Sequence, residues 1–482
     1  MRRAILYTAV AVLAAYGFVR LSRGPARLDA AALESPNASA SGLKLTVYNQ
    51  GFGLVREVRE VTLAGGVTEL AYADVAARLE PQTVHVKSLD GTGGFRVLEQ
   101  NYRFDLLSPD KLLEKYVGKS VKAYRWNDKT GHEDVVDAQV LANNGGAILK
   151  IGDEITFGYP GRLAFPELPA NLIAKPTLVW LVESQRDKQR LEVSYLTQGL
   201  NWKADYVLVI DDQDTRGDLT GWVTLTNQSG AAYKDASLKL VAGDVQRVVA
   251  PMELDGLAVG GMAMEQADRS QFREESFFEY HLYTLERPTT MLDNETKQVT
   301  LLRASQIGVT KKLQFYGAAA YYRNQYGGEV VSNQKVGVYL DMQNSEKNHL
   351  GMPLPKGIVR VYKADSAGAQ QFIGEDQIDH TPRDERVRIK MGEAFDVVGD
   401  RKQMKWTALG GCQSESAWEV ALSNHKDSAV EVEVIEPADG DWEVVESSQP
   451  PTRIDAHSFK FTLKIPARES AHISYRVRVK WC

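Results

Sequence analysis

Short runs of alternating apolar and polar residues fill the sequence from residue 43 to its end, and this pattern constrains the fold more than any other feature. LKLTVYN (43–49), LVREVREVTL (54–63) and SYRVRV (474–479) are examples. Alternation with a period of two places every second side chain on one face of a sheet, as in half-buried antiparallel strands. Turn residues separate the runs, and after the first forty residues only one short segment has a helical pattern. We therefore expect an all-β protein.

The composition permits a large core and argues against one class of partner. The chain has 482 residues, of which 43% are hydrophobic and 25% charged, a balance typical of globular domains. At about 150 residues per domain, this length predicts about three domains. The formal net charge is −6, whereas proteins that bind nucleic-acid phosphates are usually basic. We expect no nucleic-acid partner.

One segment interrupts the strand pattern. In SPDKLLEKYVG, Ser108 can cap a short helix, Pro109 suits its first position, and Gly118 ends it. Several short runs follow, separated by NDKTG, NNGG and GD turns, and the earlier pattern resumes at TLVWLVES (177–184). A capped helical turn followed by several short strands predicts a small β-barrel inserted into the N-terminal domain.

The expected fold is a multi-domain β-sandwich protein that carries this inserted barrel, because short strands with frequent turns are typical of sandwiches. Residues 250–276 combine glycines, methionines and charges without a sustained period, so we expect a mobile loop there. The expected boundaries are 1–40 for a signal peptide or membrane anchor plus linker, 41–107 and 169–212 for the N-terminal β domain, 108–168 for the barrel, and 213–482 for the C-terminal β-sandwich region.

The N-terminus has the pattern of an export signal. MRR precedes the uncharged run Ala4–Val19, as a basic region precedes the apolar region of a signal peptide. The run is slightly shorter than the roughly twenty residues of a transmembrane helix. Arg20, Arg23 and Arg27 follow it directly, which is untypical of a cleaved signal, so an uncleaved single-pass anchor is the alternative. Either interpretation predicts an exported protein, in the periplasm or at the cell surface.

The chain contains two cysteines, Cys412 and Cys482, and the second is its last residue. In an oxidising compartment, two cysteines indicate one disulfide, which would pin the C-terminal strand to the loop GGCQSES. The alternative is a pair of free thiols. Two cysteines are too few for a zinc-cysteine site.

Three stretches carry a family resemblance: YLTQGLNWKADYVL, VTLTNQSGAAYKDASLKLVAGDV and FEYHLYTLERPTTMLDNETKQVTLL. Their features are a Gly-x-x-Trp bend at Gly199 and Trp202, an Asn-Gln-Ser-Gly turn at Asn227–Gly230, and a Phe-x-Tyr-x-Leu strand at Phe278–Leu282. Over roughly residues 190–482, the chain resembles the bacterial domain-of-unknown-function family found in the C-terminal part of mucoidy inhibitor A type proteins. The resemblance implies an exported, β-rich protein of unknown biochemical activity.

An acidic cluster with one histidine lies in GEDQIDHTPRDERVRIKMGEAFDVVGD (374–400). Its spacing matches neither a helical zinc motif nor a calcium loop. Pro382 would interrupt a strand ladder, so we interpret the cluster as a polar turn between the strands QFIGEDQI and ERVRIKMG. The alternative is the site of an envelope hydrolase or a metal-dependent enzyme. The cluster consists of Asp376, Asp379, His380, Asp384 and Glu385.

Aromatic residues give the other candidate site, in FYGAAAYYRNQYGG. Tyrosine offers a large contact area at low entropic cost and can stack on sugars or protein surfaces. The alanines and paired glycines predict an exposed, adaptable loop over residues 316–328. The alternative is that these are ordinary core tyrosines. The candidate binding residues are Tyr316, Tyr321, Tyr322, Arg323 and Tyr326.

No catalytic motif emerges. The sequence has no Gly-x-Ser-x-Gly elbow, and its glycine-rich segments are not followed by a helix as in a phosphate-binding loop. We therefore expect no catalytic residue, cofactor or metal, and a non-enzymatic cell-envelope scaffold or binding module. A carbohydrate-binding protein using the tyrosine loop and a hydrolase using the 376–385 cluster are the alternatives. The expected partner is an envelope protein or polysaccharide, with membrane contact only through an uncleaved N-terminal segment.

Overall fold

The computed structural model describes residues 42–91, 94–169, 172–247 and 271–482. The predicted export segment and residues 250–270 of the predicted mobile loop lie outside these ranges. Within them the chain consists almost entirely of strands, with one short α-helix, α1 (Pro109–Lys115), and three 3-10 turns, so the all-β prediction is confirmed. No helix in these ranges is long and apolar enough to cross a membrane. The 3-10 turns are η1 (Pro81–Thr83), η2 (Ala319–Tyr322) and η3 (Glu346–Asn348).

The described chain divides into two compact units that do not follow the expected boundaries. Unit 1 contains Gly65–Ala73 and Arg96–Glu183, and unit 2 contains the rest. Residues 42–64 and 188–210, all expected in the N-terminal domain, form strands of unit 2. These strands belong there because they pair along their whole length with other strands of unit 2.

Unit 1 contains a three-stranded and a five-stranded sheet. The strand order of the first is β3-β11-β5 and that of the second is β10-β6-β7-β8-β9. The strands are β3 (Gly66–Ala73), β5 (Phe95–Arg103), β6 (Ser120–Asn127), β7 (His132–Asn143), β8 (Ala147–Ile151), β9 (Glu154–Phe157), β10 (Arg162–Ala164) and β11 (Thr177–Ser184).

The predicted barrel is wrong, because the five-stranded sheet is open. β9 and β10 are its two edges and do not pair with each other. Ser108 caps α1 as expected, its side chain accepting a hydrogen bond from the Lys111 main-chain N–H. Leu112 and Leu113 of α1, with Tyr116 after it, pack on the apolar face of the sheet. A helix therefore covers the face that closure of a barrel would have buried.

Unit 2 begins with an eight-stranded sheet that joins distant parts of the sequence. Its order is β16-β17-β15-β1-β2-β12-β4, and β18 also pairs with β15. β1 runs parallel to β15, and β2 pairs with β12 along its whole length. The strands are β1 (Lys44–Tyr48), β2 (Phe52–Thr62), β4 (His85–Ser88), β12 (Lys188–Gln198), β15 (Tyr233–Ala242), β16 (Phe272–Phe277), β17 (Tyr280–Leu285) and β18 (Thr289–Met291). β16 occupies the end of the predicted mobile loop.

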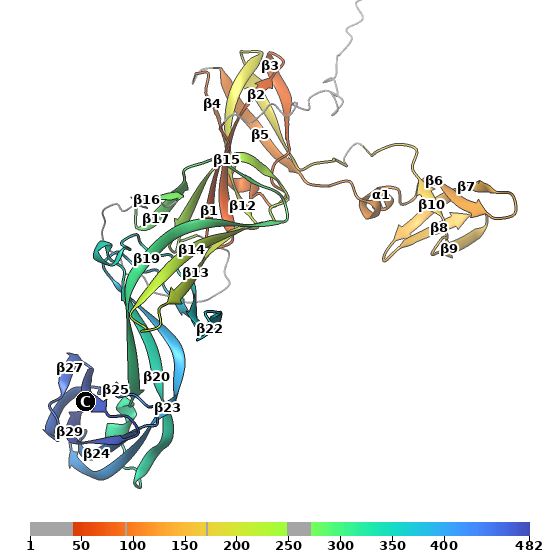
Figure 1. Ribbon diagram of the computed structural model, residues 1–482. Helices are drawn as coiled ribbons and strands as arrows, with labels where there is room; N and C mark the ends of the chain where they lie inside the picture. The colour runs from red at the N-terminus through yellow and green to blue at the C-terminus, as the bar shows by residue number, and fades with distance from the viewer. Residues whose placement is uncertain (1–41, 92–93, 170–171, 248–270) are drawn as a thin grey trace, which may run out of the picture. The chain divides into compact units, whose positions relative to one another are not determined.

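The second sheet of unit 2 has thirteen strands, and three long strands run through it (Figure 1). Its main path is β22-β21-β13-β14-β19-β20-β23-β24-β29-β26, while β25, β27 and β28 branch from β19. The long strands are β19 (Glu295–Tyr316), β20 (Glu329–Gln343) and β23 (Arg386–Gly410). The others are β13 (Leu200–Ile210), β14 (Arg216–Asn227), β21 (Gly357–Ala364), β22 (Gln370–Ile378), β24 (Gln413–Asn424), β25 (Val430–Pro437), β26 (Asp441–Ser447), β27 (Thr452–Asp455), β28 (Ser458–Ile465) and β29 (Ser470–Lys480).

The C-terminal end of unit 2 has a core of its own. Alternate residues of β24 and β29 face those of β25 and β28, as the period-two pattern requires. Trp418, Phe459 and Tyr475 are among its largest side chains, with 1%, 0% and 3% of their surface exposed. This core supports the loop and the strand that form the candidate site.

The residues that carried the family resemblance stabilise the main-chain conformation of unit 2. Gly199 has φ 81°, and a Cβ there would lie 2.5 Å from the main-chain oxygen of Gln228. Gly230 has φ 79°, and its Cβ would lie 2.4 Å from that of Ala77. Both positions therefore require glycine. The fully buried Asn227 donates from Nδ2 to two main-chain oxygens at 2.8 Å. These residues hold a tight corner of the fold.

Candidate binding site at the tyrosine loop

The acidic residues before Pro382 make separate local contacts. Asp376 Oδ2 accepts a hydrogen bond from the Lys390 main-chain N–H at 2.7 Å. Asp379, whose side chain is 88% exposed, forms an ion pair of 3.2 Å with Lys356. Among the described residues, no three His, Cys, Asp or Glu side chains are arranged to hold a metal ion.

The part of the cluster after Pro382 is a turn held by a buried asparagine. Asn344 Nδ2 donates to the Pro382 main-chain oxygen at 2.9 Å, and its main-chain N–H donates to the Glu385 oxygen at 2.9 Å. Asp384 has φ 64° and donates from its main chain to the Asn344 oxygen. The turn joins β22 to β23, which belong to different ladders. This is the polar connection between two strands that the sequence predicted.

His380 contacts a different part of unit 2. Its Nδ1 accepts a hydrogen bond from the Lys356 main-chain N–H at 3.1 Å, so the neutral ring carries its proton on Nε2. Asn49 Nδ2 lies 3.5 Å from this Nε2, and Asn49 Oδ1 is buried without a partner in the described chain. Exchanging the two amide atoms of Asn49 would let Oδ1 accept the Nε2 proton.

This environment lowers the pKa of His380 from its ordinary value of 6.5. The main cause is loss of water around the ring, and the charges of Lys356 and His281 act in the same direction, whereas those of Asp244 and Asp379 oppose it. Protonation is then easier in the unfolded chain than in the folded one. This part of the stability is fully present above pH 6.5 and decreases as the pH falls through the lower folded-state pKa.

We expect His380→Asn to weaken the pH dependence of folding. Thermal unfolding measured by circular dichroism between pH 7.5 and 4.5 should show a smaller loss of Tm for this variant than for the wild type. His472→Asn, on the distant strand β29, is the matched control. Equal slopes for the wild type and the His380 variant would contradict the assignment.

The tyrosine loop is pinned in place rather than adaptable. It connects β19 to β20 and contains η2. Gln403 Oε1 accepts a hydrogen bond from the Tyr326 main-chain N–H at 2.6 Å, and Gln403 Nε2 donates to the Asn324 main-chain oxygen at 2.9 Å. Ser414 Oγ donates to the Tyr322 main-chain oxygen at 2.6 Å. These hydrogen bonds anchor the loop to β23 and to the start of the next strand, β24.

Tyr322 is a core residue, which corrects its prediction as a binding residue. It is 1% exposed, and its hydroxyl donates to Glu436 Oε2 at 2.7 Å. Burial is the main cause that raises its pKa well above the ordinary value. The same Glu436 carboxylate accepts a hydrogen bond of 2.6 Å from Arg401 Nη1. Burial opposes the Arg401 charge, but Glu436, Tyr475 and Tyr322 together outweigh it and raise the pKa of the guanidinium.

The other predicted loop residues have different roles. Tyr316 is 38% exposed, and its hydroxyl donates to Gln314 Oε1 at 2.9 Å. Arg323 forms an ion pair of 2.7 Å with Asp439 at the surface. Tyr321 packs against both Tyr326 and Trp418, with ring centroids 5.9 and 5.8 Å away. Of the five residues, only Tyr326 lines the groove described next.

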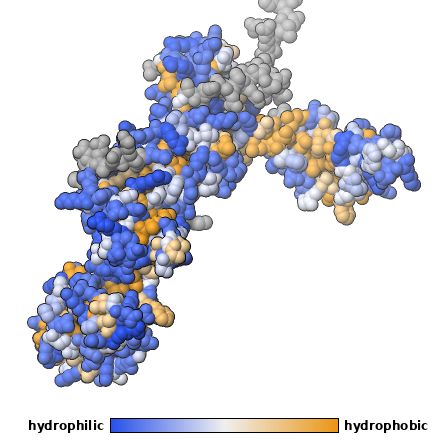
Figure 2. Space-filling model, in the orientation of Figure 1, coloured by the Kyte–Doolittle hydropathy of each residue, from blue (hydrophilic) through white to orange (hydrophobic). Residues whose placement is uncertain are grey.

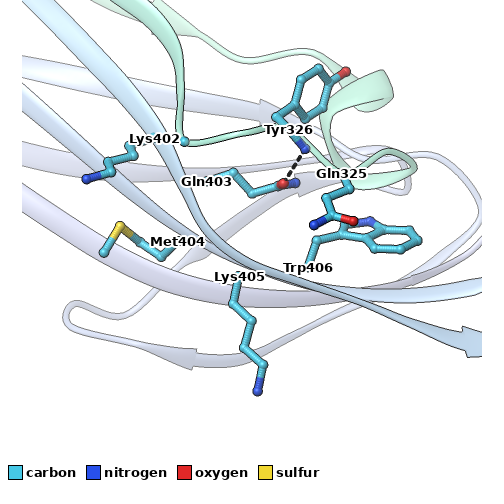
Figure 3. A pocket seen from close by; sticks show the side chains of 8 residues that line it. Gln325, Tyr326, Lys402, Gln403, Met404, Lys405 and Trp406 are labelled. Atoms are coloured by element: carbon cyan, nitrogen blue, oxygen red, sulfur yellow. Dashed lines mark hydrogen bonds between the residues drawn. The ribbon is translucent and has the colours of Figure 1, made fainter.

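A groove of about 390 Å³ lies between the end of the tyrosine loop and β23 (Figure 3). Trp406 contributes an indole Nε1–H that is buried and has no hydrogen-bond partner in the described part of the chain. The groove is lined by Gln325, Tyr326, Gly328, Lys402, Gln403, Met404, Lys405 and Trp406.

A β-bulge directs Trp406 toward this groove. Gln403 lies opposite Trp418 on β24, whereas Lys405 lies opposite Ala417, so Met404 is an extra residue in β23. The bulge shifts the alternation by one, and Trp406 lies opposite Ser416, which shares the inward face of Trp418. Strand alternation alone would have placed Trp406 on the opposite face from Gln403. A period-two pattern does not reveal a bulge, so the sequence does not predict β23 as part of a site.

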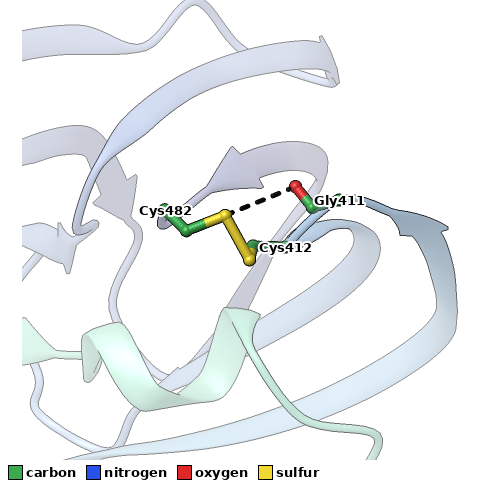
Figure 4. Close-up of a disulfide and its surroundings, with 3 residues drawn as sticks. All are labelled: Gly411, Cys412 and Cys482. Atoms are coloured by element: carbon green, nitrogen blue, oxygen red, sulfur yellow. Dashed lines mark hydrogen bonds between the residues drawn. A yellow bond between two sulfur atoms is a disulfide. The ribbon is translucent and has the colours of Figure 1, made fainter.

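Cys412 and Cys482 are joined as a disulfide, with their Cα atoms 5.7 Å apart (Figure 4). The Trp481 main-chain N–H also donates to the Cys412 oxygen at 3.1 Å. Cys412 follows β23, the strand that carries the groove. The link therefore ties the end of the chain to the end of that strand.

The surface around this end of unit 2 is mainly hydrophilic on the face that Figure 2 shows. A family model described as "Domain of unknown function (DUF4139)" matches residues 191–482. This match covers β13 to β29, including the groove and the disulfide. No curated protein matches the chain.

Proposed function

The chain belongs to the family of the domain of unknown function DUF4139, and from the groove in that domain we propose that the protein is a non-enzymatic binding module of the cell envelope, with a saccharide chain as its ligand. The observation that carries the proposal is the buried Trp406 indole N–H at the groove, which has no hydrogen-bond partner among the described residues. A buried donor without a partner is costly in free energy, and a ligand acceptor would remove that cost.

The aromatic wall of the groove is already held in position before a ligand binds. Tyr326 is held by the hydrogen bond to Gln403 and by ring contacts to Tyr321 and Trp418. Because these contacts exist without the ligand, binding need not order the loop, which lowers its entropic cost. Aromatic side chains beside an amide and a donor suit a sugar ring, which has an apolar face and a polar edge.

Two features support an envelope location. The disulfide between Cys412 and Cys482 suits an oxidising compartment outside the cytoplasm. The basic start and the apolar run Ala4–Val19 suit an export signal or an anchor. A protein ligand is the second candidate, because exposed Met404 beside Trp406 resembles the aromatic and methionine content of protein interfaces.

Trp406→Phe tests the proposal directly, because it keeps an aromatic ring and removes the N–H. We expect no loss of thermal stability, since within the described part of the chain the N–H has no partner to lose. Binding to an array of purified bacterial polysaccharides and cell-wall fragments should weaken about five- to tenfold, the effect of one hydrogen bond.

Trp126→Ala is the matched control, because Trp126 is 60% exposed and lies in unit 1. It should bind like the wild type. Equal binding by the wild type and the Trp406 variant would contradict the proposed site. Failure of the wild type to bind any glycan would leave a protein as the ligand class.

A further inference from the structure

The C-terminal part of β23 has an open side. Its ladder with β20 ends at Lys402, and one further hydrogen bond of 2.9 Å runs from the Gln403 main-chain N–H to the Gly328 oxygen. β23 then continues to Gly410 along β24 alone, and no other described strand pairs with it there. Residues 404–410 therefore form a strand edge of about 20 Å, at the usual rise of about 3.3 Å per residue.

The tyrosine loop does not fill the place beside this edge. The chain leaves the line of β20 at Gly328, which has φ 102°, and crosses the face of the sheet that carries the buried Trp418. There Tyr321 and Tyr326 pack against Trp418, with ring centroids 5.8 and 6.3 Å away. Residues 407–410 are all exposed. The position in line with β20 is thus open beside the end of β23.

The groove lies along the same edge rather than on one face of the sheet. Its lining includes the consecutive residues of β23 from Lys402 to Trp406. Side chains of consecutive strand residues point to opposite faces, and in Figure 3 those of Lys405 and Trp406 leave the strand in different directions. A groove that touches side chains of both faces runs past the main chain between them. The groove is therefore the beginning of the open edge.

Other outer strands of unit 2 carry carboxylates, which discourage pairing with a strand of another molecule. These are Asp441, Glu443 and Glu446 on β26, Glu274 and Glu275 on β16, and Glu375 and Asp376 on β22. Residues 404–410 carry a single charged side chain, that of Lys405, while Met404 and Leu409 are 55% and 46% exposed. An apolar edge with so little protection suits pairing with a partner strand.

We propose that this edge binds an extended polypeptide segment of another protein, which adds a strand beside β23 in line with β20. An open edge presents a row of main-chain donors and acceptors, which another extended main chain matches and a saccharide does not. The groove would take one side chain of the segment, and an oxygen on that side chain would accept from the Trp406 indole N–H. The inference goes beyond the proposed saccharide, and the two ligands would compete because both need the groove.

The probe for the test is a phage-displayed library of random peptides, selected on the full chain. We expect selected peptides with alternating apolar residues, which bind the wild type in biolayer interferometry. Methylation of their main-chain nitrogens, one position at a time, should weaken binding about fivefold at every second residue, the effect of one hydrogen bond. A bound peptide should also slow hydrogen exchange of the amides in residues 404–410, including those beyond the groove.

Two neighbouring proline variants test the edge itself, Thr407→Pro and Ala408→Pro. Main-chain N–H groups of neighbouring strand residues point to opposite sides, so one variant removes a donor of the open edge and the other removes a bond to β24. The first should bind the peptide about fivefold more weakly at an unchanged Tm, whereas the second should lower the Tm. Ile454→Pro, at an unpaired position of β27, is the matched control and should bind like the wild type.

Three results would overturn the inference. One is a library that yields no specific binder. Another is a selected peptide whose affinity changes at no methylated position or equally at all of them, because side chains alone would then hold it. The third is a dimer of the free protein, measured by light scattering and lost in the proline variant of the open edge, because a second copy would then occupy this edge. The glycan array with Trp406→Phe decides the proposed function separately.

Discussion

Glu436→Gln should lower the free energy of unfolding of the C-terminal end of unit 2 by about 3–5 kcal/mol, the usual cost of breaking a buried ion pair. The Arg401 and Glu436 side chains are 1% and 0% exposed, and they meet at 2.6 Å. Without the carboxylate, the guanidinium keeps its charge in a site where water cannot reach it. Its Nε and Nη2 already lack hydrogen-bond partners within the described chain, and the rings of Phe315 and Tyr321 lie over it.

The side chains around Arg401 have little room to move and so to compensate for the lost carboxylate. A Cβ on Gly317 would lie only 2.3 Å from Glu436 Oε2, so the chain passes directly over the carboxylate. The measurement is urea unfolding followed by near-ultraviolet circular dichroism, which reports the packing around Trp418.

The control for this prediction is the double variant Arg401→Met, Glu436→Leu, which removes both charges. Replacing a whole buried pair by apolar residues is often neutral or stabilising, so most of the lost stability should return. A Glu436→Gln variant within about 1 kcal/mol of the wild type would contradict the assignment, since that value is typical of exposed pairs. A double variant less stable than Glu436→Gln would also contradict it.

Cys482→Ser should cost about 3–5 kcal/mol, because the disulfide closes a loop with a sequence separation of 70 residues. In the chain-entropy model, the bond stabilises the fold by restricting the unfolded chain. The expected result is a lower urea midpoint for unfolding of the C-terminal end of unit 2. The exposed cysteines should also let a reductant reach the bond in the native protein.

Reduction of the wild type supplies the control for this second prediction. Dithiothreitol should lower its midpoint to that of the variant, and should leave the variant unchanged. Cys412→Ser should behave like Cys482→Ser, and the double variant should not add to the loss. Identical midpoints for oxidised and reduced wild type would show that the bond does not stabilise the fold.

Strand alternation predicted most of the fold, since the runs at 43–49, 54–63 and 474–479 all overlap strands. The barrel prediction failed for a physical reason. Short strands with turns specify hairpins, but whether a sheet closes depends on what covers its apolar face, and Leu112 and Leu113 cover this one. Pairing between strands that are distant in the sequence, such as β1 with β15, cannot be predicted from local sequence patterns.

Of the residues that line the candidate site, the sequence predicted only Tyr326, at the end of the tyrosine loop. The tyrosine loop drew attention through its composition, and Tyr326 does line the groove. Its neighbour Tyr322 has the same composition signal, yet a buried carboxylate 114 positions away holds it in the core. Trp406 was not predicted as a site residue, and its direction depends on one extra residue in β23. Side-chain direction and long-range partners are tertiary properties that composition does not encode.

The pairing of β1 with β15 and of β2 with β12 has a consequence for where this protein can be divided. The family match begins at residue 191, inside β12. β12 is paired over eleven residues with β2, which precedes that match by more than a hundred positions. A fragment cut at the start of the match would therefore keep an open edge with unpaired main-chain groups, a template for aggregation. The strands of residues 44–62 complete the sheet of the family domain by pairing with its open edge. A separate peptide with these residues is therefore suited to restore that edge in the fragment.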